Sequence, residues 1–285
     1  MKADVIDKAK TFDSTGTIKR LVEESLGRLQ EFRKKYPFTE DPTQIDKLTA
    51  DDIFTNTNEM GDFFCYIEHR LKEIGHLAIY GSQVYKNIKA QLDEFKKLLY
   101  ISVDKKKSIA EKVDAPWREI KKLGGDSHIA KKIIFCFNYE TKQLTPIFKT
   151  EHIEYFLQTI SEEKCFPPRY NNMSLGEKYE FLNEKLIEAK QSSQITKPWE
   201  NTYFGWFLYQ TYPPPKMPTV PMQKKKVEEK IELEQKHQFR DFNNLLNDLR
   251  GREKISAEER REYSNSWLKN PEARQILTQK LVKLK

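Results

Sequence analysis

The sequence has 285 residues, of which 50 are Lys or Arg and 43 are Asp or Glu, so the net charge is +7. A chain of this length forms one large domain or two small ones and buries enough surface to fold without a disulfide or a metal. No run of about 18 apolar residues is present, and the first residues lack the apolar core of a signal peptide. We therefore expect neither a membrane-spanning helix nor a secretion signal.

Apolar residues recur at helical spacing through most of the first part of the chain, which predicts a mostly α fold. Two short segments, residues 77–80 and 144–148, remain open as alternatives for strands. The helices are predicted at residues 18–29, 62–74, 84–99, 108–113, 117–123, 127–137, 151–160 and 175–190.

Residues 213–221 contain five prolines and predict an extended connector, because proline is excluded from helix interiors and central strands. This connector divides the chain into a helical domain, residues 1–212, and a helical tail, residues 222–285. In the tail, an amphipathic pattern covers residues 227–249. A capping-box pattern at Ser256–Glu259 starts a second helix, and Asn270–Pro271 starts a third.

Positive charge is concentrated in two regions: residues 101–150 hold 11 basic and 6 acidic residues, and residues 223–285 hold 16 and 11. In the first region, lysines surround a pattern of helix, glycine turn and helix centred on Gly124–Gly125. Backbone N–H groups at such a turn can bind a phosphate, and lysines attract a polyanion. The predicted nucleic-acid-binding residues are Lys121, Lys122, Gly124, Gly125, Ser127, His128, Lys131, Lys132 and Lys149.

A purely structural interpretation of the same residues stays open. Two glycines often join two helices, and lysines often cover solvated faces. Asp126 or Ser127 is expected to cap the second helix. Trp117 either stacks on a base or anchors the core.

No catalytic or metal site is predicted. Cys65, Cys136 and Cys165 lie among apolar residues and are expected to be reduced packing residues, which favours a cytoplasmic protein. No Cys-x-x-Cys spacing is present, and the five histidines show no pairing with a nucleophile. Asp114 with Glu119–Lys121 could be aligned with a Mg²⁺ nuclease pattern, but the segment is predicted to be helical rather than a strand. We expect no cofactor.

A loose resemblance covers about 35 residues. It consists of Leu123–Gly125, Ala130 with Ile133–Phe135, Pro146–Phe148 and Thr150–His152. The order of these segments resembles the helix-hairpin-helix DNA glycosylase superfamily. The catalytic Asp of that family would fall at or near Thr150. In this sequence neither Lys149 nor Thr150 is an acid. The resemblance therefore implies the fold and a grip on the DNA backbone rather than glycosylase chemistry.

A second resemblance covers residues 62–214 and rests on residues 124–134, 146–152, 178–183, 199–204 and 207–209. This stretch is similar to the N-terminal region attached to some McrB-type AAA+ ATPases of modification-dependent restriction systems. In those systems this region recognises DNA. The present sequence contains no Gly-x-x-x-x-Gly-Lys phosphate loop, so the resemblance implies a stand-alone relative or a specificity subunit.

The expected function is DNA binding without catalysis, with duplex DNA and an AAA+ ATPase or nuclease subunit as partners and no membrane. Specificity for a modified base would come from a pocket that the sequence does not locate. Two alternatives remain: a base-excision-type enzyme with relocated catalytic groups, and a protein-interaction module whose basic faces only keep it in solution.

Overall fold

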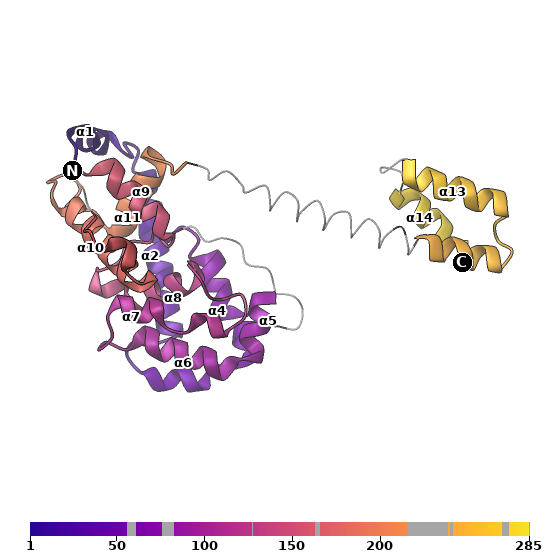
Figure 1. Cartoon of the computed structure of the whole chain (residues 1–285), viewed down its shortest axis with the longest axis horizontal. Helices are drawn as coiled ribbons and strands as arrows, with labels where there is room; N and C mark the ends of the chain where they lie inside the picture. The colour runs from indigo at the N-terminus through magenta and orange to yellow at the C-terminus, as the bar shows by residue number, and fades with distance from the viewer. Residues whose placement is uncertain are drawn as a thin grey trace. The chain divides into compact units, whose positions relative to one another are not determined.

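The computed structural model describes residues 1–55, 61–75, 83–126, 128–162, 166–215, 239, 242–269 and 274–284. Every regular element among them is a helix, which confirms the mostly α prediction. The chain divides into two compact units, Met1–Pro214 and Pro215–Lys285 (Figure 1). The predicted connector, residues 213–221, contains this boundary, and its residues from 216 onward lie outside the described ones. No helix within the described ranges is long and apolar enough to cross a membrane.

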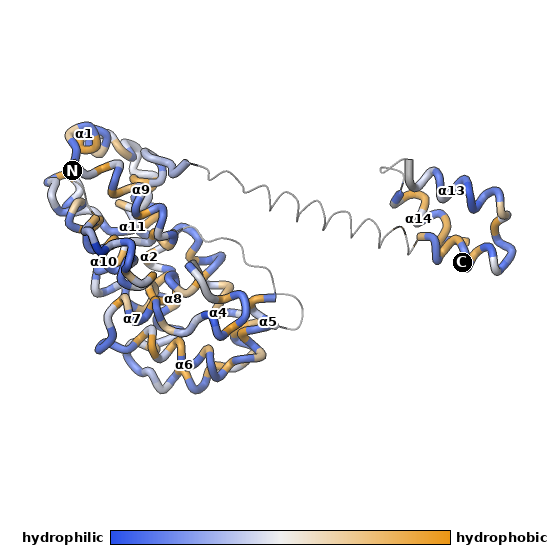
Figure 2. The backbone as a smooth tube through the Cα atoms, viewed as in Figure 1, coloured by the Kyte–Doolittle hydropathy of each residue, from blue (hydrophilic) through white to orange (hydrophobic). Residues whose placement is uncertain are grey.

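The first unit is a bundle of α-helices joined by short turns of 3-10 or π-helix. Hydrophobic and hydrophilic residues alternate along these helices, as the tube in Figure 2 shows. The α-helices are α1 (Ala3–Thr11), α2 (Thr17–Lys35), α3 (Ala50–Ile53), α4 (Asp62–Phe64), α5 (Gln83–Ala90), α6 (Leu92–Val103), α7 (Ile109–Asp114), α8 (His128–Asn138), α9 (Thr150–Ile160), α10 (Leu175–Gln191) and α11 (Asn201–Thr211). The other turns are η1 (Pro42–Lys47), η2 (Cys65–Arg70), η3 (Trp117–Glu119), η4 (Tyr139–Thr141) and η5 (Tyr170–Asn172).

Helix α8 lies at the centre of the first unit. It packs against α2, α6, α7 and η2, and every residue from Ile129 to Asn138 is buried. A helix that is apolar on nearly all sides is expected to be surrounded by others. The two lysines in this helix, Lys131 and Lys132, are therefore inside the protein.

Helix α10 packs closely on α7 because Gly176 has no side chain. A Cβ atom there would overlap the backbone carbonyl of Ala110. The backbone N–H of Gly176 donates to Asp114 Oδ1 at 2.7 Å. The start of α10 is also fixed by a capping box between Ser174 and Glu177. These contacts hold the segment before the glycine turn against the rest of the bundle.

The structure confirms the helices predicted at residues 18–29, 108–113, 127–137, 151–160 and 175–190 and differs from four other predictions, three of which follow here. The helix expected over 84–99 breaks at Gln91, whose φ of −125° is not helical. The segment 62–74 continues from α4 into a π-helix rather than an α-helix. Residues 144–148 form no strand, whereas 77–80 lie outside the described residues.

The helix predicted over residues 117–123 is wrong. Only the three residues of η3 form a helical turn. Lys122 takes a φ of +72°, which lies in the left-handed region and interrupts a right-handed helix. The expected first arm of the hairpin is thus a set of turns, and only the second arm, α8, is an α-helix.

The second unit has its own small core. Residues 242–251 are helical, and α13 (Ala257–Lys269) and α14 (Arg274–Val282) follow. The predicted capping box is confirmed, since Ser256 N–H donates to Glu259 Oε2 at 2.7 Å and Glu259 N–H donates to Ser256 Oγ at 3.1 Å. The predictions for residues 227–238 and for Asn270–Pro271 lie outside the described residues. The buried side chains are Phe242, Leu246, Leu249, Ile255, Trp267 and Leu281.

The two described cysteines of the first unit are free thiols. Cys136 is fully buried in α8, and burial raises its pKa to about 12. Cys65 is partly exposed at the start of η2. Cys165 lies outside the described residues.

Candidate nucleic-acid interface

Trp117 stands at the start of the segment that leads to the glycine turn. Its side chain is only 3% exposed, and its indole N–H donates to the carbonyl of Lys112 at 2.9 Å. A base cannot stack on a buried ring, so the stacking prediction is wrong. Trp117 is the core anchor that the alternative interpretation expected.

Both glycines of the turn have structural reasons to be glycine. A Cβ atom on Gly124 would overlap the Cα and Cβ atoms of Arg118, so the turn closes tightly over that residue. Gly125 has a φ of +98°, which side-chain-bearing residues rarely adopt. These two requirements explain the Gly-Gly pair without any ligand.

Asp126, directly after the glycines, joins the turn to helix α9. Its carboxylate accepts hydrogen bonds from Thr150 Oγ1 at 3.0 Å and from the backbone N–H of Thr150 at 3.3 Å. It also forms an ion pair with Lys131. The first N–H of α9 is thereby satisfied by a side chain from another element. Asp126 or Ser127 was expected to cap α8. The carboxylate of Asp126 lies on the start of α9 instead, and Ser127 lies outside the described residues.

Lys131 is enclosed by this same group of residues. The side chain is 1% exposed. Its ammonium donates to Thr150 Oγ1 at 2.6 Å and lies 4.4 Å from the ring centroid of Tyr179. Burial lowers the pKa of Lys131.

Lys132 is fully buried on another side of α8. Its ammonium donates to the carbonyls of Leu71 at 2.6 Å and of Gly75 at 3.2 Å. Burial lowers its pKa to about 8. The prediction that Lys131 and Lys132 contact phosphates is wrong in this structure, because both ammonium groups lie in the interior on protein acceptors.

Lys121 and Lys122 are exposed, in contrast to the later pair. The carbonyl of Lys121 accepts a hydrogen bond from Asn87 Nδ2 at 2.7 Å, which holds this loop beside α5. Lys86, one residue before Asn87, is exposed, as is Arg118.

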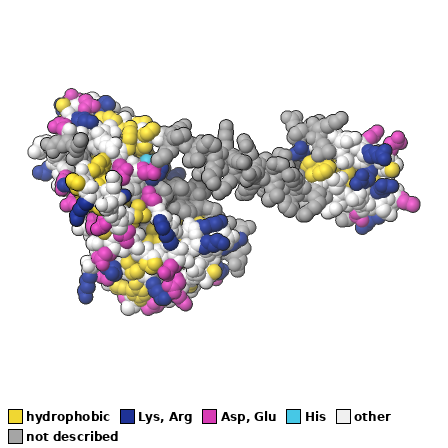
Figure 3. All heavy atoms as spheres, viewed as in Figure 1, with side chains coloured by type: hydrophobic (Ala, Val, Ile, Leu, Met, Phe, Trp, Pro, Cys, Tyr) yellow, Lys and Arg dark blue, Asp and Glu magenta, His cyan; other side chains and the backbone are white. Residues whose placement is uncertain are grey.

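We name Lys86, Arg118, Lys121 and Lys122 the basic surface. Within the described part of the chain, none of these four side chains has a carboxylate within 4.0 Å. Glu119 is exposed in the same turn and offsets one of the four charges. Figure 3 shows Lys and Arg side chains close together over the region of α5.

The remaining predicted contacts are separate from the basic surface or not described. Lys149 precedes α9, has 29% of its side chain exposed, and pairs with Glu151 at 3.0 Å. Its charge is therefore compensated. Ser127 and the side chain of His128 lie outside the described residues.

Sequence reasoning missed Lys86 and Arg118. For Lys86 a signal existed, because Val84, Tyr85 and Ile88 are apolar and direct the remaining positions of α5 toward solvent. For Arg118 the signal was absent, since its exposure depends on the turn around Gly124. In the described residues, no group of three or more His, Cys, Asp or Glu side chains is placed to hold a metal ion.

The chain was compared with protein-family models, with curated proteins and with solved structures, and no significant match was found in any of the three. The functional argument therefore depends on the chain's own residues.

Proposed function

We propose that this protein is a non-catalytic DNA-binding protein and that the basic surface contacts the phosphates of a duplex. The observation that supports the proposal is the set of four exposed cations, Lys86, Arg118, Lys121 and Lys122, from two neighbouring segments. Among the described residues, none of the four has a carboxylate partner. Phosphate contacts of this kind position a protein on DNA and carry no sequence information. The resemblance to restriction systems adds two parts to this proposal. The protein recognises a modified base, and its partner is an ATPase or a nuclease subunit.

The glycine turn has a positioning role in the proposal. It holds Arg118 under Gly124 and leads directly from the exposed lysine pair into α8. Lys131 and Lys132 maintain the interior around it instead of gripping DNA. In this proposal, one α-helix and the turn before it, which carries exposed cations, replace the predicted helix-hairpin-helix element.

The test is the affinity for a labelled duplex, measured by fluorescence anisotropy from about 50 mM to about 200 mM salt. With four phosphate contacts, the logarithm of the association constant should fall with the logarithm of salt with a slope of about −3 to −4. The double variant K121E/K122E should lose more than about tenfold in affinity, because two attractions become repulsions. The control K19E/R20E reverses two exposed charges on α2 and should leave affinity nearly unchanged.

Equal loss of affinity in both double variants would mean that only net charge matters and would reject the basic surface as the contact. Absence of binding at about 50 mM salt would reject DNA binding altogether and favour a protein-interaction module. A parallel titration with cytosine-methylated duplex tests the modification-related part of the proposal.

A further inference from the structure

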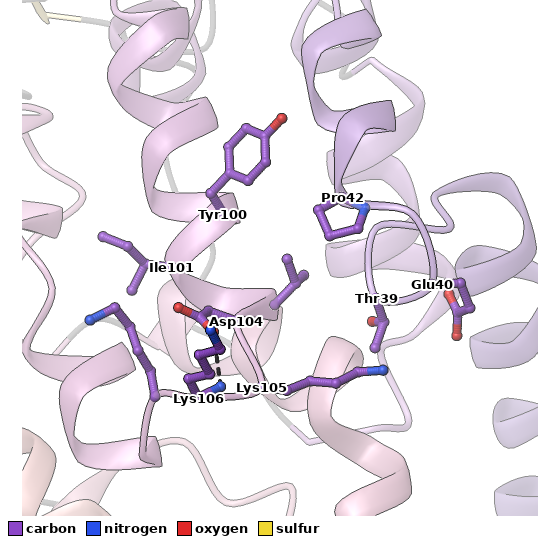
Figure 4. A pocket seen from close by; sticks show the side chains of 10 residues that line it. Thr39, Glu40, Pro42, Tyr100, Ile101, Asp104, Lys105 and Lys106 are labelled. Carbon is purple, nitrogen blue, oxygen red and sulfur yellow. Dashed lines mark hydrogen bonds between the residues drawn. The ribbon is translucent and has the colours of Figure 1, made fainter.

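The triplet Lys105–Lys107, which the proposed function does not use, lines one end of a cleft in the first unit (Figure 4). The cleft lies between the end of α6, the loop after it and residues 39–42, and its volume is about 520 Å³. Small-molecule sites in proteins have volumes of about 300–1,000 Å³. One ligand of that size therefore fits.

Hydrogen bonds fix the walls of this cleft. The Tyr100 hydroxyl donates to Asp46 Oδ2 at 2.9 Å, which holds the phenol ring at the edge of α6. Thr39 Oγ1 donates to the carbonyl of Phe137 at 3.2 Å, which holds the opposite wall. A site with fixed walls needs little ordering when a ligand binds.

The carboxylates that line the cleft already have partners. Glu40 forms an ion pair with Arg33 at 3.2 Å. Asp104 accepts a hydrogen bond from the backbone N–H of Lys106 at 2.8 Å, as the dashed line in Figure 4 shows. Arg33 compensates the charge of Glu40, whereas Asp104 keeps its negative charge and offsets one of the lysine charges of the loop.

Two of the three lysines form no ion pair with the described residues. Lys107 pairs with Glu111 at 3.6 Å. Lys105 and Lys106 are exposed, and no carboxylate of the described ranges lies within 4.0 Å of either ammonium. Figure 4 shows both side chains leaving the loop at one end of the cleft. This end favours an anionic group.

The other end of the cleft is apolar and includes one flat ring. Pro42 and the half-exposed ring of Tyr100 lie on opposite sides of it, and Ile101 and Val103 extend the apolar wall along α6. Aromatic rings are the surfaces on which proteins stack unpaired bases. A ligand that satisfies both ends has a planar apolar part joined to an anion.

We propose that this cleft binds a nucleoside phosphate, with the base on the Tyr100 ring and the phosphate between Lys105 and Lys106. The same chemistry is offered by a free nucleotide and by an unpaired nucleotide of a single strand. A duplex keeps its bases stacked on one another and does not offer it. The site shares no residue with the basic surface, so it goes beyond the proposed function.

Isothermal titration calorimetry of the full chain with adenosine monophosphate, a short oligothymidylate and inorganic phosphate tests the proposal. We expect at least one nucleotide probe to bind more tightly than inorganic phosphate. Binding of the mononucleotide identifies a free nucleotide as the ligand, and binding of the oligonucleotide alone identifies a single strand. Both results support the site only if binding weakens at least about fivefold in Y100L, the loss expected when a stacking ring is removed.

Three further variants make the test specific. K105E/K106E should abolish nucleotide binding, whereas Y100F keeps the ring, loses only the hydrogen bond to Asp46 Oδ2, and should weaken binding less than Y100L. K121E/K122E should leave nucleotide binding unchanged, so a failure of the duplex proposal does not affect this result. Circular dichroism during heating shows whether each variant is folded.

Two results would overturn the proposal. The first is that nucleotides do not bind, or bind with no higher affinity than inorganic phosphate. The same conclusion follows if nucleotide affinity is unchanged in folded Y100L and K105E/K106E. The other is binding of an acidic, phenylalanine-containing peptide at these residues when neither nucleotide probe binds, which would identify the cleft as a protein-docking site.

Discussion

Two pairs of adjacent lysines, Lys121–Lys122 and Lys131–Lys132, lie close together in the sequence and have opposite roles in the structure. The first pair is exposed on a turn, and the second is buried in α8. Both are the dipeptide Lys-Lys, so residue type alone does not decide between a surface cation and an interior one. Apolar residues flank both pairs, but only the second pair is followed by a long apolar run, Ile133–Phe137, whereas Gly124 and Gly125 follow Leu123 after the first.

The buried pair shows what an interior ammonium needs. Lys131 has Asp126, Thr150 Oγ1 and the Tyr179 ring, and Lys132 has two backbone carbonyls. A buried charge without such acceptors would be strongly unfavourable.

Two more lysines of the first unit are buried and donate hydrogen bonds to protein acceptors. Lys112 donates to Asn138 Oδ1 at 2.6 Å, and Lys190 donates to Asn201 Oδ1 and the Trp199 carbonyl, each at 2.7 Å. A count of basic residues therefore overstates the positive charge that a nucleic acid would meet.

The largest effect is expected when the buried pair loses a charge. K132M should lower the free energy of unfolding by about 2–4 kcal/mol, because the carbonyls of Leu71 and Gly75 lose their buried donor. Urea unfolding of K132M and of the exposed counterpart K121M measures the difference. A loss below about 0.5 kcal/mol in K132M, as is usual for surface changes, would contradict the internal role of Lys132.

The turn between the two pairs should give the next largest effect. G124A should lower the free energy of unfolding by about 1–3 kcal/mol, because the new methyl group overlaps Arg118. In G125A the added atom meets open space, and only the left-handed backbone opposes it, at a cost of about 1–2 kcal/mol. Thermal unfolding of both variants compares them, and a fully stable G124A would argue against the tight turn.

A pH titration tests the burial of Lys132. The pKa of Lys132 is about 8 in the folded protein against 10.5 ordinarily, so above pH 8 the unfolded chain binds more protons at this residue. The contribution of Lys132 to the free energy of unfolding should therefore rise with pH above 8. The difference between the wild-type chain and K132M, measured by urea unfolding from pH 7 to about 9.5, should grow in favour of the wild type. A flat difference would show that Lys132 titrates normally.

The smallest effect on stability is expected at the exposed pair. K121M/K122M should change the free energy of unfolding by less than about 0.5 kcal/mol, since both side chains are exposed and neither ammonium has a partner among the described residues. The same variant should weaken duplex binding and reduce the salt slope by about two. A loss of stability as large as that of K132M would mean that the exposed pair also supports the fold.

Much of the fold followed from periodicity. The apolar run of α8 and the amphipathic patterns of α9 and α10 predicted those helices within one or two residues of their observed ends. The break at Gln91 did not follow, because neither glycine nor proline marks it. The turns after Trp117 did not follow either, because the left-handed φ at Lys122 is set by tertiary packing and not by residue preference.

The candidate site was predicted in part. The sequence located the basic region and the glycine turn, and it placed Lys121 and Lys122 correctly on the surface. It placed Lys131 and Lys132 there too, although the unbroken apolar run from Ile133 to Phe137 already indicated a helix buried on all sides. Periodicity indicates which face of a helix is apolar. The hydrogen-bond acceptors that allow a lysine to be buried come from segments distant in the sequence, such as residues 71–75.

The carboxylate of Asp126 has a consequence for the kinetics of the proposed DNA binding. It joins the glycine turn, α8 and the first residue of α9 through one group, so the loop that presents Lys121 and Lys122 is anchored at its far end. Docking of a polyanion on a pre-shaped loop requires no folding step, and its association rate is governed by electrostatic steering. For the proposed DNA binding, added salt should therefore slow association more than it speeds dissociation of the complex.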